Sequence, residues 1–309
     1  VTERICYLLR QGIEPERILA VTFTNKAAGE MKERLAKMMG KKANLKQLIA
    51  STFHSLCARM LRRDGEAIGL PKEFAIYDAD DQARVIKGFL KEDDLPATGE
   101  TKPSLILGAI SRAKNDGLTA DQMEDRAITH HERLVARFAR RYAAELKRLD
   151  ALDFDDLLLE GLRLLQEAPA VADRYRAKWE YLHVDEYQDT NRIQYTWVRE
   201  LAAKHGNLCV VGDDDQSIYG WRGAKIENIH RYSSDFSDVQ TIRLEQNYRS
   251  TRSILDVANE VISHNKGQIE KVLFTENAEG EKIKLVRTLT DNDEGKFIAD
   301  SIQEQKLRH

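Results

Sequence analysis

Cysteine, net charge and long apolar runs are all scarce in this sequence. Its 309 residues include only three cysteines, Cys6, Cys57 and Cys209, at wide and irregular spacings. This odd number argues against a disulfide framework or a zinc ribbon, so we expect a reducing compartment. No apolar run reaches the roughly 18 residues of a membrane-spanning helix, and no signal-peptide pattern opens the chain. We therefore expect a cytoplasmic protein with no membrane partner.

Charges of the two signs almost cancel. The 48 basic and 51 acidic residues give a formal net charge of −3. Such a balance neither supports nor excludes nucleic-acid binding, because a local groove can be basic on an acidic protein. The composition is that of a globular protein, and the length predicts at least two domains.

Both ends of the chain lie within helical patterns. The chain starts at Val1 instead of a methionine, and Ile5, Leu8 and Leu9 already recur at helical spacing. The final residues, SIQEQKLRH, are helical in pattern without a capping glycine. We expect a piece of a longer protein.

Short apolar runs alternate with helical patterns in two stretches of the sequence. The expected elements are strands within 17–23, 48–52, 181–184 and 208–211, and helices over 24–40, 54–63 and 191–204. Thr24 or Asn25 would cap the first of these helices and Gly40 would end it. This alternation is the signature of a parallel sheet with crossover helices, so the predicted fold class is α/β.

Between the two stretches nearly every segment has helical periodicity, which predicts an all-helical insertion into the α/β core. The segment GEKIKLVRTL, residues 280–289, predicts new strand-and-helix material and hence a further α/β domain. We divide the chain into residues 1–75 and 179–242 (first domain), 76–178 (helical insertion) and 243–309 (start of the second domain).

Two adjacent carboxylates, Asp185 and Glu186, directly follow the apolar run YLHV. Ligands of parallel sheets gather outside the carboxyl ends of the strands. An aspartate there can hold a water-coordinated Mg²⁺ bridging nucleotide phosphates, and the glutamate can orient and deprotonate the attacking water. The alternative is that both acids cap the next helix, and on these two residues alone capping is favoured.

The loop GDDDQSIYGWRGA follows the next strand. Gln216 can bind a γ-phosphate or the attacking water, while Tyr219 and Trp221 can stack on bases and Arg222 can contact phosphate. Alternatively Trp221 packs under the sheet, and the acids 213–215 form a solvated turn, since they lack the spacing of a calcium loop.

The segment RLEQNYRST contains Tyr248 and Arg249. An arginine that reaches transferring phosphates stabilises charge in the transition state, and a tyrosine can stack on a purine. Alone, this segment is weak support for either role.

Five segments, AVTFTNKAA, STFHS, VDEYQD, VGDDDQSIYGWRGA and LEQNYRS, occur in this order. They resemble motifs Ia, Ib, II, III and IV of superfamily 1 DNA helicases, above all of the UvrD/Rep/PcrA group. The resemblance implies a RecA-like parallel-sheet motor domain with a large all-helical insertion, followed by the start of a second α/β motor domain. It also implies an ATP- and Mg²⁺-dependent helicase that moves 3′ to 5′ on single-stranded DNA, acts at single-strand/duplex junctions and serves DNA repair or replication.

The resemblance assigns a role to each matched residue. On the nucleotide side Asp185 would hold Mg²⁺, Glu186 would be the general base, Gln216 would sense the γ-phosphate, Tyr248 would stack on adenine and Arg249 would contact phosphate. On the DNA side the groove would be lined by Phe23, Thr24, Asn25, Thr52, His54, Tyr219, Trp221 and Arg222.

The sequence departs from the family pattern in one respect that matters for catalysis. It contains no GxxxxGK[ST] phosphate loop, because the Gly-Lys pairs at Gly40 and Gly295 lack the preceding glycine, and the family's motifs V and VI are also missing. We predict that these 309 residues alone do not hydrolyse ATP. Three alternatives remain: a non-catalytic module that binds single-stranded DNA, the helicase subunit of a recombination nuclease and, least favoured by the motifs, a helicase acting on RNA.

Overall fold

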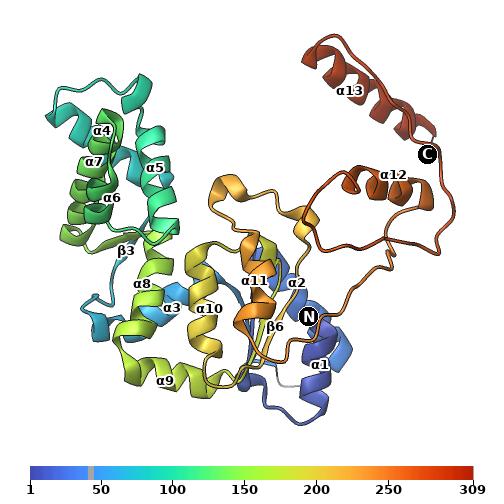
Figure 1. Cartoon of the computed structure of the whole chain (residues 1–309), viewed down its shortest axis with the longest axis horizontal. Coiled ribbons are helices and arrows are strands. Elements are labelled where there is room, and N and C mark those ends of the chain that lie inside the picture. Colours follow the sequence, from blue (N-terminus) through green and yellow to red (C-terminus); the bar gives the residue numbers. More distant parts are fainter. Residues whose placement is uncertain (41–44, 309) are drawn as a thin grey trace. The chain divides into compact units, whose positions relative to one another are not determined.

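The computed structural model describes residues 1–40 and 45–308, which form two compact units, Val1–Val239 and a second one from Gln240 onward (Figure 1). All the strands found among these residues lie in the first unit, as two sheets. In the described part of the chain no helix combines the length and the apolar character needed to span a bilayer.

A four-stranded parallel sheet forms the centre of the first unit, in the order β2-β1-β5-β6. Its strands are β1 (Ile18–Thr22), β2 (Ile49–Thr52), β5 (Tyr181–Val184) and β6 (Leu208–Val210). All residues of the inner strand β1 are buried, as expected for a parallel strand covered on both faces. The predicted α/β class is confirmed, and each of the four strands lies inside its expected range.

Alternate residues of β1 belong to different cores, because successive side chains of a strand point to opposite faces. Ile18 and Ala20 join one core, and Leu19 and Val21 join the other. The first core also contains side chains of α1 (Thr2–Arg10) and α2 (Asn25–Met39). The second contains those of α3 (Phe53–Asp64), α8 (Phe154–Glu167), α9 (Pro169–Lys178) and α10 (Arg192–Ala202). Helices therefore cover both faces of the sheet.

Hydroxyl caps fix the helices that follow β1 and β2. The Thr24 Oγ1 accepts a hydrogen bond from the Ala27 amide at 3.1 Å, and the Thr52 Oγ1 accepts one from the Ser55 amide at 3.2 Å. Gly40 ends α2 with a φ of 76°. The expected N-terminal cap at Thr24 and the glycine stop are confirmed.

Four helices form a lobe with its own apolar core, visible together in Figure 1: α4 (Ala79–Glu92), α5 (Pro103–Asn115), α6 (Ala120–Arg126) and α7 (His130–Arg148). One short strand precedes these four helices in the sequence and another follows them, β3 (Ala75–Tyr77) and β4 (Ala151–Asp153). The two strands pair in parallel. The sequence predicted helices alone here. Each strand is only three residues long, too short for a recognisable alternation.

Helices α8 and α9 also fall inside the predicted insertion, residues 76–178. Their buried side chains, however, belong to the core of the four-stranded sheet and not to the core of the lobe. The segment predicted as one insertion thus divides between two cores. The short helix α11 (Glu227–Asp235) follows the loop after β6.

The second unit contains α12 (Arg252–Ile262), α13 (Asp291–Arg308) and one isolated bridge between Gln246 and Phe274. The prediction of a strand within 280–289 is wrong, since the residues described from 240 to 308 include no strand. Apolar side chains such as Leu285 and Leu289 stay exposed there. A strand needs a neighbour to take its backbone hydrogen bonds, and this segment pairs with no described strand.

Candidate functional site

Asp185 and Glu186 lie at the carboxyl end of β5, an inner strand of the sheet. The Asp185 amide donates to the Val21 carbonyl of β1 at 2.9 Å, which holds this end of β5 against its neighbour. Asp185 is half-buried and Glu186 is exposed. Burial raises the pKa of Asp185, and the adjacent Glu186 charge raises it further.

Glu186 has a left-handed backbone, with a φ of 53°. The other non-glycine residues with positive φ in the described chain are aspartates, which tolerate this region better than glutamate does. Neither acid caps the next helix, because Asn191 caps α10 through the Gln194 amide at 2.8 Å. Glu186 also makes no side-chain cap hydrogen bond to the turn Tyr187–Asp189 that follows it, so the capping interpretation is wrong.

Gln188, to which the sequence assigned no role, connects Glu186 to the loop after β6. Its Nε2 donates to the Glu186 Oε2 at 2.8 Å, and its Oε1 accepts from the Asp213 amide at 3.1 Å. A Cβ added at Gly212 would lie 2.7 Å from the same Oε1, so only glycine allows this approach. The sequence shows a polar residue two positions after Glu186. It does not show that this residue bonds both Glu186 and a segment 25 residues further along the chain.

Two buried oxygen atoms on residues that adjoin the acidic pair in register or in sequence lack a hydrogen-bond partner. The register pairs Val21 with Val184, so Thr22 and Asp185 come next on neighbouring strands. The Thr22 Oγ1 and the Asp189 Oδ1 are buried without a hydrogen-bond partner among the described residues. Burial, with the Glu186 charge second, raises the pKa of Asp189 to about 6. Carboxylate and hydroxyl oxygens are the ligands that Mg²⁺ prefers, so the chemistry of these residues suits that ion. Among the described residues, the group of three acids whose oxygens lie within 4.8 Å of one another is 213–215, on the loop after β6.

The loop after β6 places Gln216 beside its own acidic turn. The Gln216 Nε2 donates to the Asp213 Oδ2 at 2.6 Å, and the Asp213 Oδ1 accepts from the Asp215 amide at 3.1 Å. Gln216 is exposed. Its predicted role at a γ-phosphate would require the side chain to exchange the Asp213 carboxylate for that ligand.

Aromatic rings from two distant segments meet at this loop. Phe23, just after β1, stacks on Tyr219 with ring centroids 6.0 Å apart, and Tyr219 lies 6.4 Å from Trp221. Trp221 is 70% exposed, so the alternative that it packs under the sheet is wrong. The Arg222 side chain lies outside the described residues.

Residues of the first two motifs lie at the starts of α2 and α3 in the same unit. Thr24 and Asn25 are exposed at the start of α2, and the buried Thr52 caps α3. The His54 ring lies 5.9 Å from the ring of Phe154, which is 49% exposed at the start of α8. Burial lowers the pKa of His54, because it disfavours the charged ring. Phe154 was missed, although an exposed aromatic residue beside an N-terminal cap is the available signal.

Tyr248 and Arg249 belong to the second unit, and both side chains are exposed. The Tyr248 hydroxyl donates to the Gln246 Oε1 at 2.7 Å, while the Asn247 Oδ1 accepts from the Arg249 amide at 2.8 Å. This short turn presents both side chains to solvent. Their roles at a nucleotide remain predictions.

Comparison with known proteins matches both units to domain families. Residues 1–237 match the UvrD/REP helicase N-terminal domain, and residues 242–309 match the UvrD-like helicase C-terminal domain. The chain is 47% identical over 307 residues to the ATP-dependent DNA helicase PcrA of Staphylococcus aureus strain Mu50, and 46% identical to that of Staphylococcus epidermidis strain RP62A. Each match covers 99% of this chain but only 42% of the relative.

Proposed function

The chain belongs to the UvrD/REP helicase family, and on that premise we propose that it carries the magnesium-binding and DNA-contacting parts of an ATP-dependent DNA helicase. The full protein would move 3′ to 5′ on single-stranded DNA, unwind duplexes at single-strand/duplex junctions and serve DNA repair or replication in the cytoplasm. Because the chain spans only 42% of its relatives' length, the proposal concerns the protein that carries these residues.

One observation carries this proposal: a single loop connects the acidic pair to the aromatic rings. Gln188 joins Glu186 to the Asp213 amide, at the start of the loop that ends with Tyr219 and Trp221. A ligand that moves Glu186 would therefore move the loop, and a base held by Trp221 would act back on Glu186. An ATP-driven DNA motor requires such reciprocal coupling.

On the nucleotide side, Asp185 would hold Mg²⁺, with Thr22 and Asp189 offering further oxygen atoms nearby. The ion would neutralise developing charge on the phosphates. Glu186 would accept the proton of the attacking water at the carboxylate oxygen that Gln188 leaves free. Gln216 would bind the γ-phosphate, Arg249 would stabilise its charge and Tyr248 would stack on adenine.

On the DNA side, bases would stack on Trp221 and Tyr219, with Phe23 behind Tyr219. Stacking accepts every base, because each has a π-face, so the grip would not depend on sequence. The remaining groove residues would be Thr24, Asn25, Thr52, His54 and Arg222, to which we add Phe154. Closing and opening of the nucleotide site would alternately tighten and release this grip.

We expect the 309 residues alone not to hydrolyse ATP. Phosphoryl transfer depends on positioned groups around the phosphates, and the sequence contains no GxxxxGK[ST] loop to supply them. A turnover rate above background from the purified chain would contradict this expectation.

The test is ATP hydrolysis by the full-length protein that carries this chain, with and without oligo(dT). Glu186→Gln should lower DNA-stimulated turnover by roughly 10²- to 10⁴-fold, the usual contribution of a general base. The matched control is Glu227→Gln, which neutralises an exposed acid in the first turn of α11 and should change little. Binding of DNA without any hydrolysis by the wild type would favour the non-catalytic module instead.

A further inference from the structure

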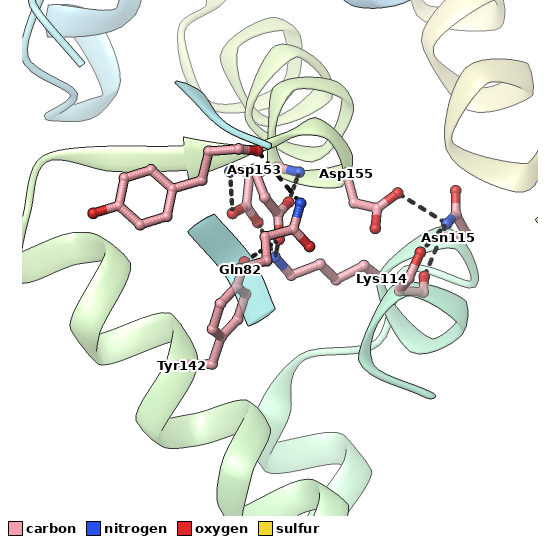
Figure 2. Close-up of polar contacts among 9 residues, drawn as sticks. Gln82, Lys114, Asn115, Tyr142, Asp153 and Asp155 are labelled. Carbon is pink, nitrogen blue, oxygen red and sulfur yellow. Dashed lines mark hydrogen bonds and ion pairs between the residues drawn. The ribbon is translucent and has the colours of Figure 1, made fainter. Parts of the chain in front are cut away.

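The last two residues of α5, Lys114 and Asn115, contact different segments of the first unit. Figure 2 shows Lys114 and Asn115 side by side, with Lys114 directed to Asp153 and Asn115 to Asp155. Both acids lie at the point where β4 passes into α8. The end of α5 therefore contacts the chain as it leaves the lobe.

Lys114 fixes this contact. Its Nζ lies 2.7 Å from carboxylate oxygens of both Asp153 and Asp156, and the Tyr142 hydroxyl donates to the same Asp153 oxygen at 3.0 Å. The Lys114 and Asp153 side chains are 12% and 4% exposed. Because such a buried pair is stable only when both partners are in place, the end of α5 cannot shift on α8 without breaking it.

Asn115 extends the contact to the segment after the acidic pair. Its Nδ2 donates to the Ser111 carbonyl at 2.8 Å and to the Asp155 Oδ1 at 3.1 Å, while its Oδ1 accepts from the Asn191 Nδ2. Asn191 is the buried cap of α10. With both donor hydrogens and the acceptor oxygen engaged, the amide has one favourable orientation.

The turn that carries Trp221 passes close to the Asn115 side chain. Gly223 ends the turn Gly220–Arg222 in a left-handed conformation, with a φ of 87°, and a Cβ added there would lie 3.2 Å from the Asn115 Cβ. Two residues later, the Lys225 amide donates to the Thr190 carbonyl at 3.0 Å. Asn115 and the segment 190–191 thus contact the same stretch of chain, residues 223–225, directly after Trp221 and Arg222.

We propose that Asn115 is a positioning residue that holds the Trp221 turn in its DNA-stacking orientation, so that the helical lobe sets the strength of the grip. The inference rests on the proposed function, because it takes Trp221 to stack on bases. Asn115 itself lies under the turn and touches no nucleotide in this scheme. It acts on DNA only through Gly223 and Asn191.

The experiment is a double-mutant cycle on the full chain, with the affinity for labelled oligo(dT) measured by fluorescence anisotropy. Trp221→Ala should weaken binding by about 10-fold or more, as loss of one stacked base does. Asn115→Ala keeps the Cβ nearest Gly223 but removes the amide that accepts from Asn191. It should weaken binding by about 5-fold when Trp221 is present and by less than about 2-fold in the Trp221→Ala background. The matched control, Ser104→Ala, changes an exposed residue in the first turn of α5, away from the Trp221 turn, and should leave affinity unchanged.

Three results would overturn the proposal. Equal losses from Asn115→Ala in both backgrounds would mean that Asn115 only stabilises the fold. No loss from Asn115→Ala, while Trp221→Ala weakens binding, would refute positioning and leave the proposed function intact. No loss from Trp221→Ala would refute the stacking role and positioning together. If Asn115→Ala does not fold, Asn115→Ser keeps a small neutral polar side chain that is too short to bond both Asp155 and Asn191, and it should give the same coupling.

Discussion

Two acidic clusters of the first unit differ in how their charges are partnered. At the start of α8, Lys114 faces Asp153 and Asp156, and each of these acids also accepts a backbone amide in a capping box. At the end of β5, Glu186 has only the Gln188 amide group as a side-chain partner, and the Asp189 Oδ1 has no partner among the described residues. The first cluster stabilises the fold, whereas the second, within the described part of the chain, leaves its carboxylates without an ion pair.

The pKa values follow the same division. Burial raises the pKa of Asp153, but the Lys114 charge and the hydrogen bonds to Asp153 lower it overall. One ammonium group cannot neutralise two carboxylates, so burial and the Asp153 charge raise the pKa of Asp156 to about 7. At the end of β5, Asp185 forms no ion pair with any residue the structure describes, and burial followed by the Glu186 charge raises its pKa.

Removing the cation of the first cluster should have the largest effect on stability. Lys114→Met leaves two buried carboxylates without a counter-charge, which should lower the free energy of unfolding by about 3–5 kcal/mol. Asp185→Asn should stay within about 0.5 kcal/mol of wild type, because it removes a charge that burial and Glu186 already disfavour. Urea unfolding at pH 8 measures both. Equal losses of unfolding free energy from the two variants would mean that the two clusters contribute alike to stability.

A buried base without a counter-charge sharpens the contrast with Lys114. His183 lies in β5, two residues before Asp185, and is 1% exposed. Burial, followed by the charge of Arg4, lowers its pKa to about 4. A lowered histidine pKa gives stability that is present above pH 6.5 and is lost as pH falls towards 4.

His183→Gln should therefore lose less stability than wild type between pH 6.5 and 4.5, by roughly 2–3 kcal/mol. Urea midpoints across this range give the two slopes. The control is His230→Gln, which removes an exposed imidazole from α11 and should keep the wild-type slope. If His183→Gln also keeps that slope, protonation of His183 does not cause the loss of stability at low pH.

The smallest effect concerns the strained backbone of the second cluster. Glu186→Gly and Glu186→Ala both remove the carboxylate and its bond to Gln188, but only glycine adopts a φ of 53° without a steric penalty. Glu186→Gly should be the more stable of the two variants by about 1 kcal/mol. This order is the reverse of that in a helix. Thermal unfolding compares them, and a more stable alanine variant would show that Glu186 carries no strain.

Local signals decided much of this protein. The apolar runs of β1, β2, β5 and β6, the cap at Thr24 and the stop at Gly40 were all predicted, because each depends on the residues of its own segment. The acidic pair and the loop around Trp221 were also located from the sequence. The motif order alone identified the family, since five short segments in a fixed order do not depend on how they meet in space.

The tertiary structure decided what lies far apart in the sequence. The pairing of β3 with β4, the contact of Phe23 with Tyr219 and the Lys114 network join residues whose own segments carry no sign of the partner. The reverse holds for residues 280–289, where a strand pattern forms no strand because no described strand pairs with it. Sequence by itself determined which residues could form an element or hold a ligand. Only the tertiary structure decided which of them meet, because buried contacts and backbone pairing depend on the whole fold.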